Sequence, residues 1–162
     1  MAKTLDKPSL YDTDYVAWLE EQAAHLRAGR LSALDVPNVA EELEGLARSD
    51  RHELANRLES LILHLLKWDQ QPDQRSNRWR ASAAEQRRRL RRLLKDSPSL
   101  QRSLEDTARE VYPEAIEQAA IETRLSETAF PATLPYSLKQ LFERELPAGE
   151  LPTQRSTRKK HP

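Results

Sequence analysis

Side chains that could do chemistry recur every seven residues along one helical stretch, at Asp50, Arg57 and His64. At about 100° per residue, positions seven apart lie close to one line along a helix. A carboxylate, a guanidinium and an imidazole on one line could bind an anion or move protons. Glu53 precedes Arg57 by four residues and can pair with it. This polar line is therefore the first place to look for function.

Three interpretations of the polar line stay open. We favour an internal ladder of ion pairs that fixes helix register, because buried charges persist only when they are paired. The second interpretation is a ligand or substrate site lined by Arg57 and His64. The third is a helix break near residues 49–50, since Asp50 and Glu53 have the spacing of a capping box.

A second candidate cluster surrounds a polar turn that follows the same stretch. Trp68 and Trp79 flank this turn, and Arg75 lies within it. The two indole rings could wall a pocket in which Arg75 binds an anion, but such tryptophans more often form the edge of a core. Lys67 lies beside them, on a line of small and polar residues for which we favour close helix packing over a binding groove.

A third candidate is an arginine-rich helix that could lie along a phosphate backbone. Between residues 75 and 102 there are ten basic residues and two acidic ones. The proposed contacts, for nucleic acid or for an acidic or phosphorylated partner, are Arg87, Arg88, Arg91 and Arg92. No aromatic residues interleave with these arginines to stack on bases. Acidic neighbours at residues 35–59 and 105–127 favour charge pairing inside the bundle or across a dimer instead.

Several classes of site are excluded by composition. The chain has no cysteine, so thiolate catalysis, disulfides and Cys-based metal sites are ruled out. It has three glycines, too few for a P-loop or a dinucleotide motif, and neither HExxH nor Glu-x-x-His occurs. A three-histidine metal site would need His25, His52 and His64, which face different ways. We therefore expect no metal and no cofactor.

The helices that must position these residues are indicated by apolar residues three and four apart. We expect a first helix capped by Asp12 or Thr13 and stopped at Gly29, then an unusually long helix over about residues 35–68 whose apolar stripe includes Leu43 and Leu46. A third helix begins at 76–77. A fourth begins with Ser97 as cap and is interrupted by Pro113. A short helix over 137–144 follows.

These elements predict an all-α fold, a bundle of four main helices plus a short C-terminal one. We expect one helical-bundle domain over residues 10–147, with arms at 1–9 and 148–162. No stretch is apolar enough to cross a membrane, and the first residues lack the apolar core of a secretory signal, so a cytoplasmic location is expected.

Six segments stand out in order: YDTDYVAWLEEQAAHLR, NVAEELEGLARSDR, RLESLILHLLKWDQQP, RSNRW, SPSL and FPATLP. In this order the chain resembles the bacterial proteins grouped as domain-of-unknown-function family 29, which are abundant in cyanobacteria and also found in proteobacteria. The resemblance covers about residues 10–147, and its most specific piece is HLLKW followed by QP and RS. It implies a small all-helical protein and no established activity, cofactor or catalytic residue. The positions that match the family pattern are Tyr11, Asp12, Trp18, Asn38, Glu41, Glu42, Glu44, Arg48, Ser49, Arg57, His64, Lys67, Trp68, Pro72, Arg75, Trp79, Ser97, Pro98 and Glu122.

Three hypotheses about function result. The first is a non-enzymatic cytoplasmic protein that acts by binding, in one version as a homodimer. The second is nucleic-acid binding through the arginine-rich helix over residues 87–92. The third is an enzyme with a site near His64 and Arg57.

Overall fold

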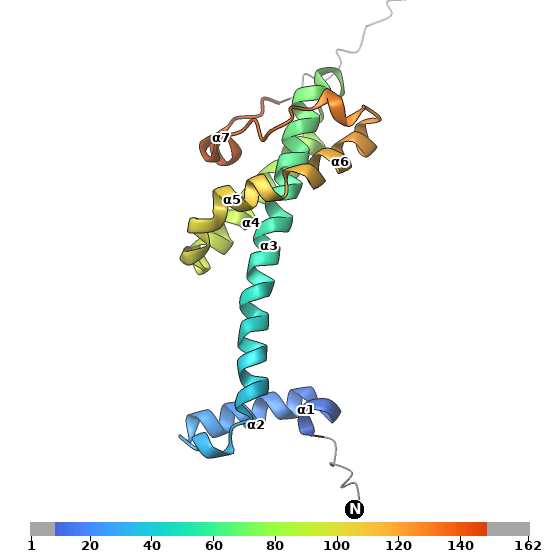
Figure 1. Ribbon diagram of the computed structural model, residues 1–162. Coiled ribbons are helices and arrows are strands. Elements are labelled where there is room, and N and C mark those ends of the chain that lie inside the picture. The colour runs from blue at the N-terminus through green and yellow to red at the C-terminus, as the bar shows by residue number, and fades with distance from the viewer. Residues whose placement is uncertain (1–8, 149–162) are drawn as a thin grey trace, which may run out of the picture. The chain divides into compact units, whose positions relative to one another are not determined.

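The computed structural model describes residues 9–148 and contains seven α-helices there (Figure 1). The helices are α1 (Leu10–Thr13), α2 (Tyr15–Arg27), α3 (Val36–Gln70), α4 (Asn77–Asp96), α5 (Leu104–Glu110), α6 (Tyr112–Thr123) and α7 (Leu138–Glu143). Short 3₁₀ turns connect them at Leu31–Ala33, Pro72–Gln74, Pro98–Ser103 and Glu127–Ala129. No strand occurs within residues 9–148, which confirms the all-α bundle. The expected arms lie almost wholly outside these residues.

Most predicted helix boundaries are confirmed by their local chemistry. Ser76 caps α4 by accepting the backbone N–H of Trp79 at 3.3 Å. Gly29 takes a positive φ of 66° just past the end of α2, which glycine adopts without strain. The interruption at Pro113 is present, because α5 ends at Glu110 and α6 carries this proline in its first turn.

Two predicted caps are wrong. Asp14, rather than Asp12 or Thr13, caps α2, because its Oδ1 accepts the backbone N–H of Ala17 at 3.0 Å. Ser97 does not cap the next helix, since its hydroxyl donates to Asp50 Oδ2 at 2.9 Å instead, and the chain continues as a 3₁₀ turn. Helix α3 continues through residues 49–50, so the alternative in which Asp50 begins a new helix is also wrong.

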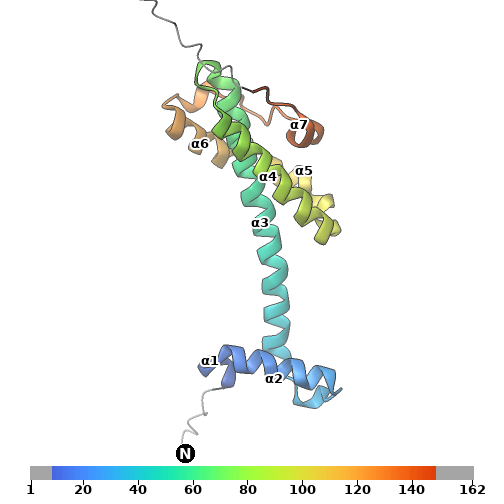
Figure 2. The ribbon, with the colours of Figure 1, turned by 180° about the vertical axis from the view of Figure 1, so that it is seen from behind.

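The described residues divide into two compact units, of which the first is residues 9–49 and the second is residues 50–148. In the second unit, helices α4 to α7 gather around the second half of α3 (Figures 1 and 2). Its core holds nine fully buried large side chains: Leu54, Leu58, Leu61, Ile62, Leu65, Leu66, Leu90, Leu104 and Leu141. The predicted central position of the LILHLL segment is therefore confirmed, apart from the half-buried His64.

The first unit is built differently. Its described part holds α1, α2 and the first half of α3, and only Trp18 and Gln22 are buried there. Leu43 and Leu46, which the apolar stripe of α3 placed toward a core, are 62% and 66% exposed. An apolar stripe shows that a helix face can be covered, but it does not show what covers it. Among the described residues, no helix is long and apolar enough to cross a membrane.

Candidate functional site

The three members of the predicted polar line each have a different partner in the second unit. Arg57 donates from Nε to Glu53 at 3.4 Å and from a terminal nitrogen to Gln86 at 3.2 Å. Asp50 accepts from Ser97, as described above, and His64 Nδ1 donates to the carbonyl oxygen of Ser60 at 2.6 Å. All three are half-buried, and none bonds to another. The line is thus a series of separate contacts along α3.

The surroundings of His64 favour its neutral form over its charged form. Burial lowers the pKa of His64, the bond to the Ser60 carbonyl raises it, and the positive charge of Lys67 lowers it further, so the net shift is downward. A neutral imidazole has one N–H, which here donates to Ser60, and one nitrogen that can accept a hydrogen bond or a proton. No group of three metal-ligating side chains surrounds it or any other described residue.

Lys67 forms the most deeply buried ion pair among the residues that the structure describes. Its Nζ is 2.5 Å from Glu122 Oε2 and 4.6 Å from the centre of the Trp79 ring. The Lys67 side chain is 8% exposed and that of Glu122 is 35% exposed. Burial alone would raise the pKa of Glu122, but the hydrogen bond and charge of Lys67 outweigh it and hold this pKa below its usual value. Lys67 thus joins α3 to α6 as a buried ion pair.

Trp68 and Arg75 form a separate contact next to that pair. Trp68 is 2% exposed and belongs to the core. The guanidinium of Arg75 lies 5.2 Å from the centre of the Trp68 ring, and its Nε donates to the Trp68 carbonyl at 2.8 Å. Both contacts use Arg75 to close the turn between α3 and α4.

The arginine-rich helix α4 divides its arginines between two tasks. Arg87 donates to the carbonyls of Leu141 at 2.6 Å and Arg144 at 2.7 Å, and Arg91 donates to that of Phe142 at 2.7 Å. These acceptors lie at the C-terminal end of α7, where helix carbonyls lack partners and a positive charge is stabilising. Two of the four candidate contacts therefore fasten α7 to α4.

The other two candidates, Arg88 and Arg92, line a polar cleft between α3 and α4. The cleft has a volume of about 530 Å³ and is lined by Asp50, Glu53, Arg88, Arg89, Arg92, Leu93 and Asp96. Arg88 pairs with Glu85, and Arg92 lies 3.8 Å from Asp96. This cleft thus brings together residues of the predicted polar line and residues of the arginine-rich helix. Three guanidinium groups and three carboxylates line it. Because the charges of this lining cancel, the cleft has no net positive charge that would attract a polyanion.

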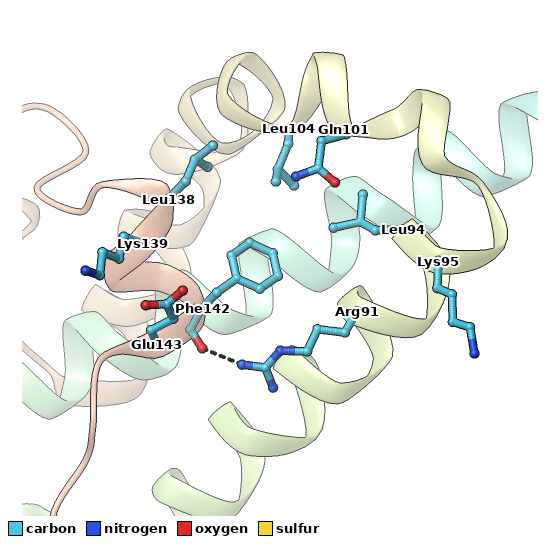
Figure 3. A pocket seen from close by; sticks show the side chains of 9 residues that line it. All are labelled: Arg91, Leu94, Lys95, Gln101, Leu104, Leu138, Lys139, Phe142 and Glu143. Carbon is cyan, nitrogen blue, oxygen red and sulfur yellow. Dashed lines mark hydrogen bonds between the residues drawn. The ribbon is translucent and has the colours of Figure 1, made fainter.

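A second hollow, of about 460 Å³, lies between α4, α5 and α7 (Figure 3). Its lining residues are Arg91, Leu94, Lys95, Gln101, Leu104, Leu138, Lys139, Phe142 and Glu143. The Phe142 ring points into it, whereas the amino groups of Lys95 and Lys139 point away from its centre (Figure 3). The lining is therefore mixed, with four apolar side chains beside an amide and charged groups of both signs, and sequence analysis did not identify this hollow.

Comparison with known proteins assigns the chain to a family. The chain matches the family described as "Domain of unknown function DUF29" over residues 10–146. The chain belongs to this family. No curated protein and no solved structure matches it. Membership in DUF29 confirms the resemblance seen in the sequence and supplies no activity, so function has to be argued from the residues of this chain.

In the first unit of this DUF29 chain, a cluster of three aromatic rings and two carboxylates went unrecognised in the sequence. The hydroxyls of Tyr11 and Tyr15 donate to the two oxygens of Glu42, each at 2.6 Å. These bonds raise the pKa of Tyr11 to about 12 and hold the pKa of Glu42 below its usual value. Trp18 packs edge-on against Tyr11 at 4.7 Å and donates from its indole nitrogen to Asp35 at 3.2 Å. The four-residue spacing of the tyrosines was the available signal.

Proposed function

We propose that this DUF29 chain acts by binding a protein, and that the binding surface is the apolar face of its first unit. One observation carries the proposal. Of the ten large hydrophobic side chains that are exposed among the described residues, nine belong to the first unit: Leu10, Tyr15, Val16, Leu19, Leu26, Leu31, Val36, Leu43 and Leu46. Single exposed hydrophobic residues are ordinary, but a concentration of them marks an interaction surface.

The surface is a property of ordered helices rather than of a loop. The polar cluster of Tyr11, Tyr15 and Glu42 fixes α1 and α2 to the start of α3, so the apolar side chains are presented on a fixed scaffold. Rigid presentation lowers the entropy cost of association. In this proposal the chain works in the cytoplasm, and the absence of cysteine is compatible with that location.

The proposal is tested by placing a photo-crosslinking amino acid at Leu43 in the full chain, in the cells that produce it. The matched control is Ile121 on α6, which is 65% exposed, close to the 62% of Leu43, but stands alone in the second unit. We expect a covalent adduct of higher mass from position 43 and none from position 121. Equal adducts from both positions, or only an internal crosslink without gain in mass, would contradict the proposal.

Nucleic-acid binding is a second candidate that one observation favours, the exposure of Arg88 and Arg92 at 76% and 86% of their side chains. It has less support because Arg87 and Arg91 are engaged with α7 and because the cleft beside Arg88 and Arg92 also holds carboxylates. Retention of duplex or single-stranded DNA at low salt, lost in Arg88→Ala/Arg92→Ala, would establish it.

A further inference from the structure

The described part of the first unit has two buried residues, Trp18 and Gln22, so it has almost no apolar core of its own. Its helices are joined mainly by polar contacts, such as the Trp18 and Asn38 side chains donating to Asp35, and by the Gln22 side chain accepting the Asp35 backbone N–H at 2.8 Å. Units of roughly 40 residues usually need a disulfide, a metal or oligomerisation. The chain has no cysteine, and no metal-ligating cluster occurs among the described residues. Of these three sources, oligomerisation is the one that the described residues leave open.

The uncovered side chains of α2 follow the spacing of a helix that packs against another helix. Val16, Leu19, Ala23 and Leu26 are separated by three, four and three residues, and the three large ones are 64%, 40% and 50% exposed. This is the alternation of first and fourth heptad positions in packed helix pairs. On α3 the same alternation recurs at Val36, Val39, Leu43 and Leu46. Figures 1 and 2 show α2 lying across the start of α3, so the first unit presents two such helices.

The area of this surface fits a dimer. A buried methylene corresponds to about 32 Å² of apolar surface, so complete burial of all nine exposed hydrophobic residues would remove at most roughly 600 Å² per chain from water. Two copies would therefore bury at most roughly 1,200 Å² of this apolar surface, which is the lower end of specific interfaces. An interface between two copies of this chain can therefore reach this area without any other partner.

The charges beside the apolar line on α2 identify the occupant as a second copy. Glu20 and Arg27 are seven residues apart, so they lie on the same flank of α2, on the side away from Trp18. Neither has an ion-pair partner among residues 9–148. Two antiparallel copies of α2, centred between Ala23 and Ala24, place Glu20 of each copy beside Arg27 of the other. In the same alignment Leu19, Ala23 and Leu26 of the two copies alternate along the seam. Because the two copies are related by a twofold axis, the Glu20–Arg27 ion pair forms twice, once on each side of the axis.

We propose that the first units of two copies of this chain pack together through their apolar faces, with α2 antiparallel to α2 of the second copy and Glu20 paired with Arg27 of the second copy. This inference rests on the proposed function, because it names the partner of the same surface.

The test is light scattering of the full chain during size-exclusion chromatography, over a range of protein concentrations. We expect a dimer that Glu20→Arg and Arg27→Glu each weaken about tenfold, because both charge pairs become repulsive. The control Glu21→Arg makes the same charge change on the opposite side of α2 and should leave the dimer unchanged. An equimolar mixture of Glu20→Arg and Arg27→Glu chains should form heterodimers, and the double variant Glu20→Arg/Arg27→Glu should dimerise like the wild type.

Each other result overturns the inference. A wild-type monomer at every concentration excludes the second copy, and a dimer that neither single variant weakens excludes this alignment. Failure of the mixture and the double variant to recover the dimer excludes the Glu20–Arg27 pair. The proposed function fails separately: if the chain is monomeric but Leu43 still crosslinks to a different protein, the surface binds a partner that is not a copy. If the chain is monomeric and Leu43 forms no adduct, both proposals fail.

Discussion

The buried pair of Lys67 and Glu122 makes an asymmetric prediction, because its two members are buried to different extents. Glu122→Gln leaves the ammonium group of Lys67, whose side chain is 8% exposed, without a counterion. Breaking a fully buried pair costs about 3–5 kcal/mol. Since the glutamine oxygen still accepts a hydrogen bond and the site is open on the Glu122 side, we expect a loss of about 2 kcal/mol in the free energy of unfolding.

Lys67→Met removes the other member of the pair at lower cost. The methionine side chain keeps the apolar contact with Trp79, and the remaining carboxylate, 35% exposed, can be hydrated. We expect a loss within about 1 kcal/mol. The double variant Lys67→Met/Glu122→Gln should be more stable than Glu122→Gln alone, because it no longer contains an unpaired buried charge.

The assay is urea unfolding of the full chain followed by helical circular dichroism, with the midpoint and slope fitted for each variant. Equal losses for the two single variants would show that burial does not distinguish the two charges. A double variant no more stable than Glu122→Gln would show that the loss comes from packing rather than from an unpaired ammonium. Either result would refute the reasoning.

Three further predictions concern other contacts of the second unit. His64 has a lowered pKa in the folded state, so the unfolded chain takes up a proton first as the pH falls below about 6.5. The free energy of unfolding should therefore fall between that pH and the pKa of His64 in the folded state. His64→Gln should flatten this part of a plot of unfolding free energy against pH. Arg87→Ala should lower the free energy of unfolding in urea by about 2 kcal/mol and speed amide exchange in α7, because three carbonyls lose a charged donor. The control Arg88→Ala removes an exposed side chain and should change the free energy of unfolding by less than about 0.5 kcal/mol. Equal effects of the two variants would contradict the division of tasks on α4. Asp69→Asn should cost about 2 kcal/mol in the same assay, since its carboxylate accepts two bonds from Arg144 and one from Tyr136, and an unchanged unfolding midpoint would count against this network.

The helices were predictable because their signals are local. Ser76 at the start of α4, Gly29 after α2 and Pro113 at the start of α6 each act on neighbouring backbone groups, so their effect can be read without knowing the fold. Asp14 was missed because several competent caps stand side by side in the sequence, and only geometry selects one.

The contacts of the candidate sites were not predictable, because they join residues far apart in sequence. Lys67 and Glu122 are 55 residues apart, and Ser97 and Asp50 are 47 apart. The contact of Arg87 with α7 has no sequence signature on the acceptor side, since backbone carbonyls are the same for every residue. Periodicity also identified the apolar face of α3 without distinguishing its buried half from its exposed half.

The attachment of α7 to α4 has a practical consequence for work on shortened chains. A fragment that ends before Leu138 would keep α4 but lose the carbonyls to which Arg87 and Arg91 donate. Two guanidinium groups with bonds inside the whole chain would then face solvent beside Arg88 and Arg92. Such a fragment would gain affinity for heparin and DNA as an artefact of truncation, so a positive result with it would say nothing about the intact protein.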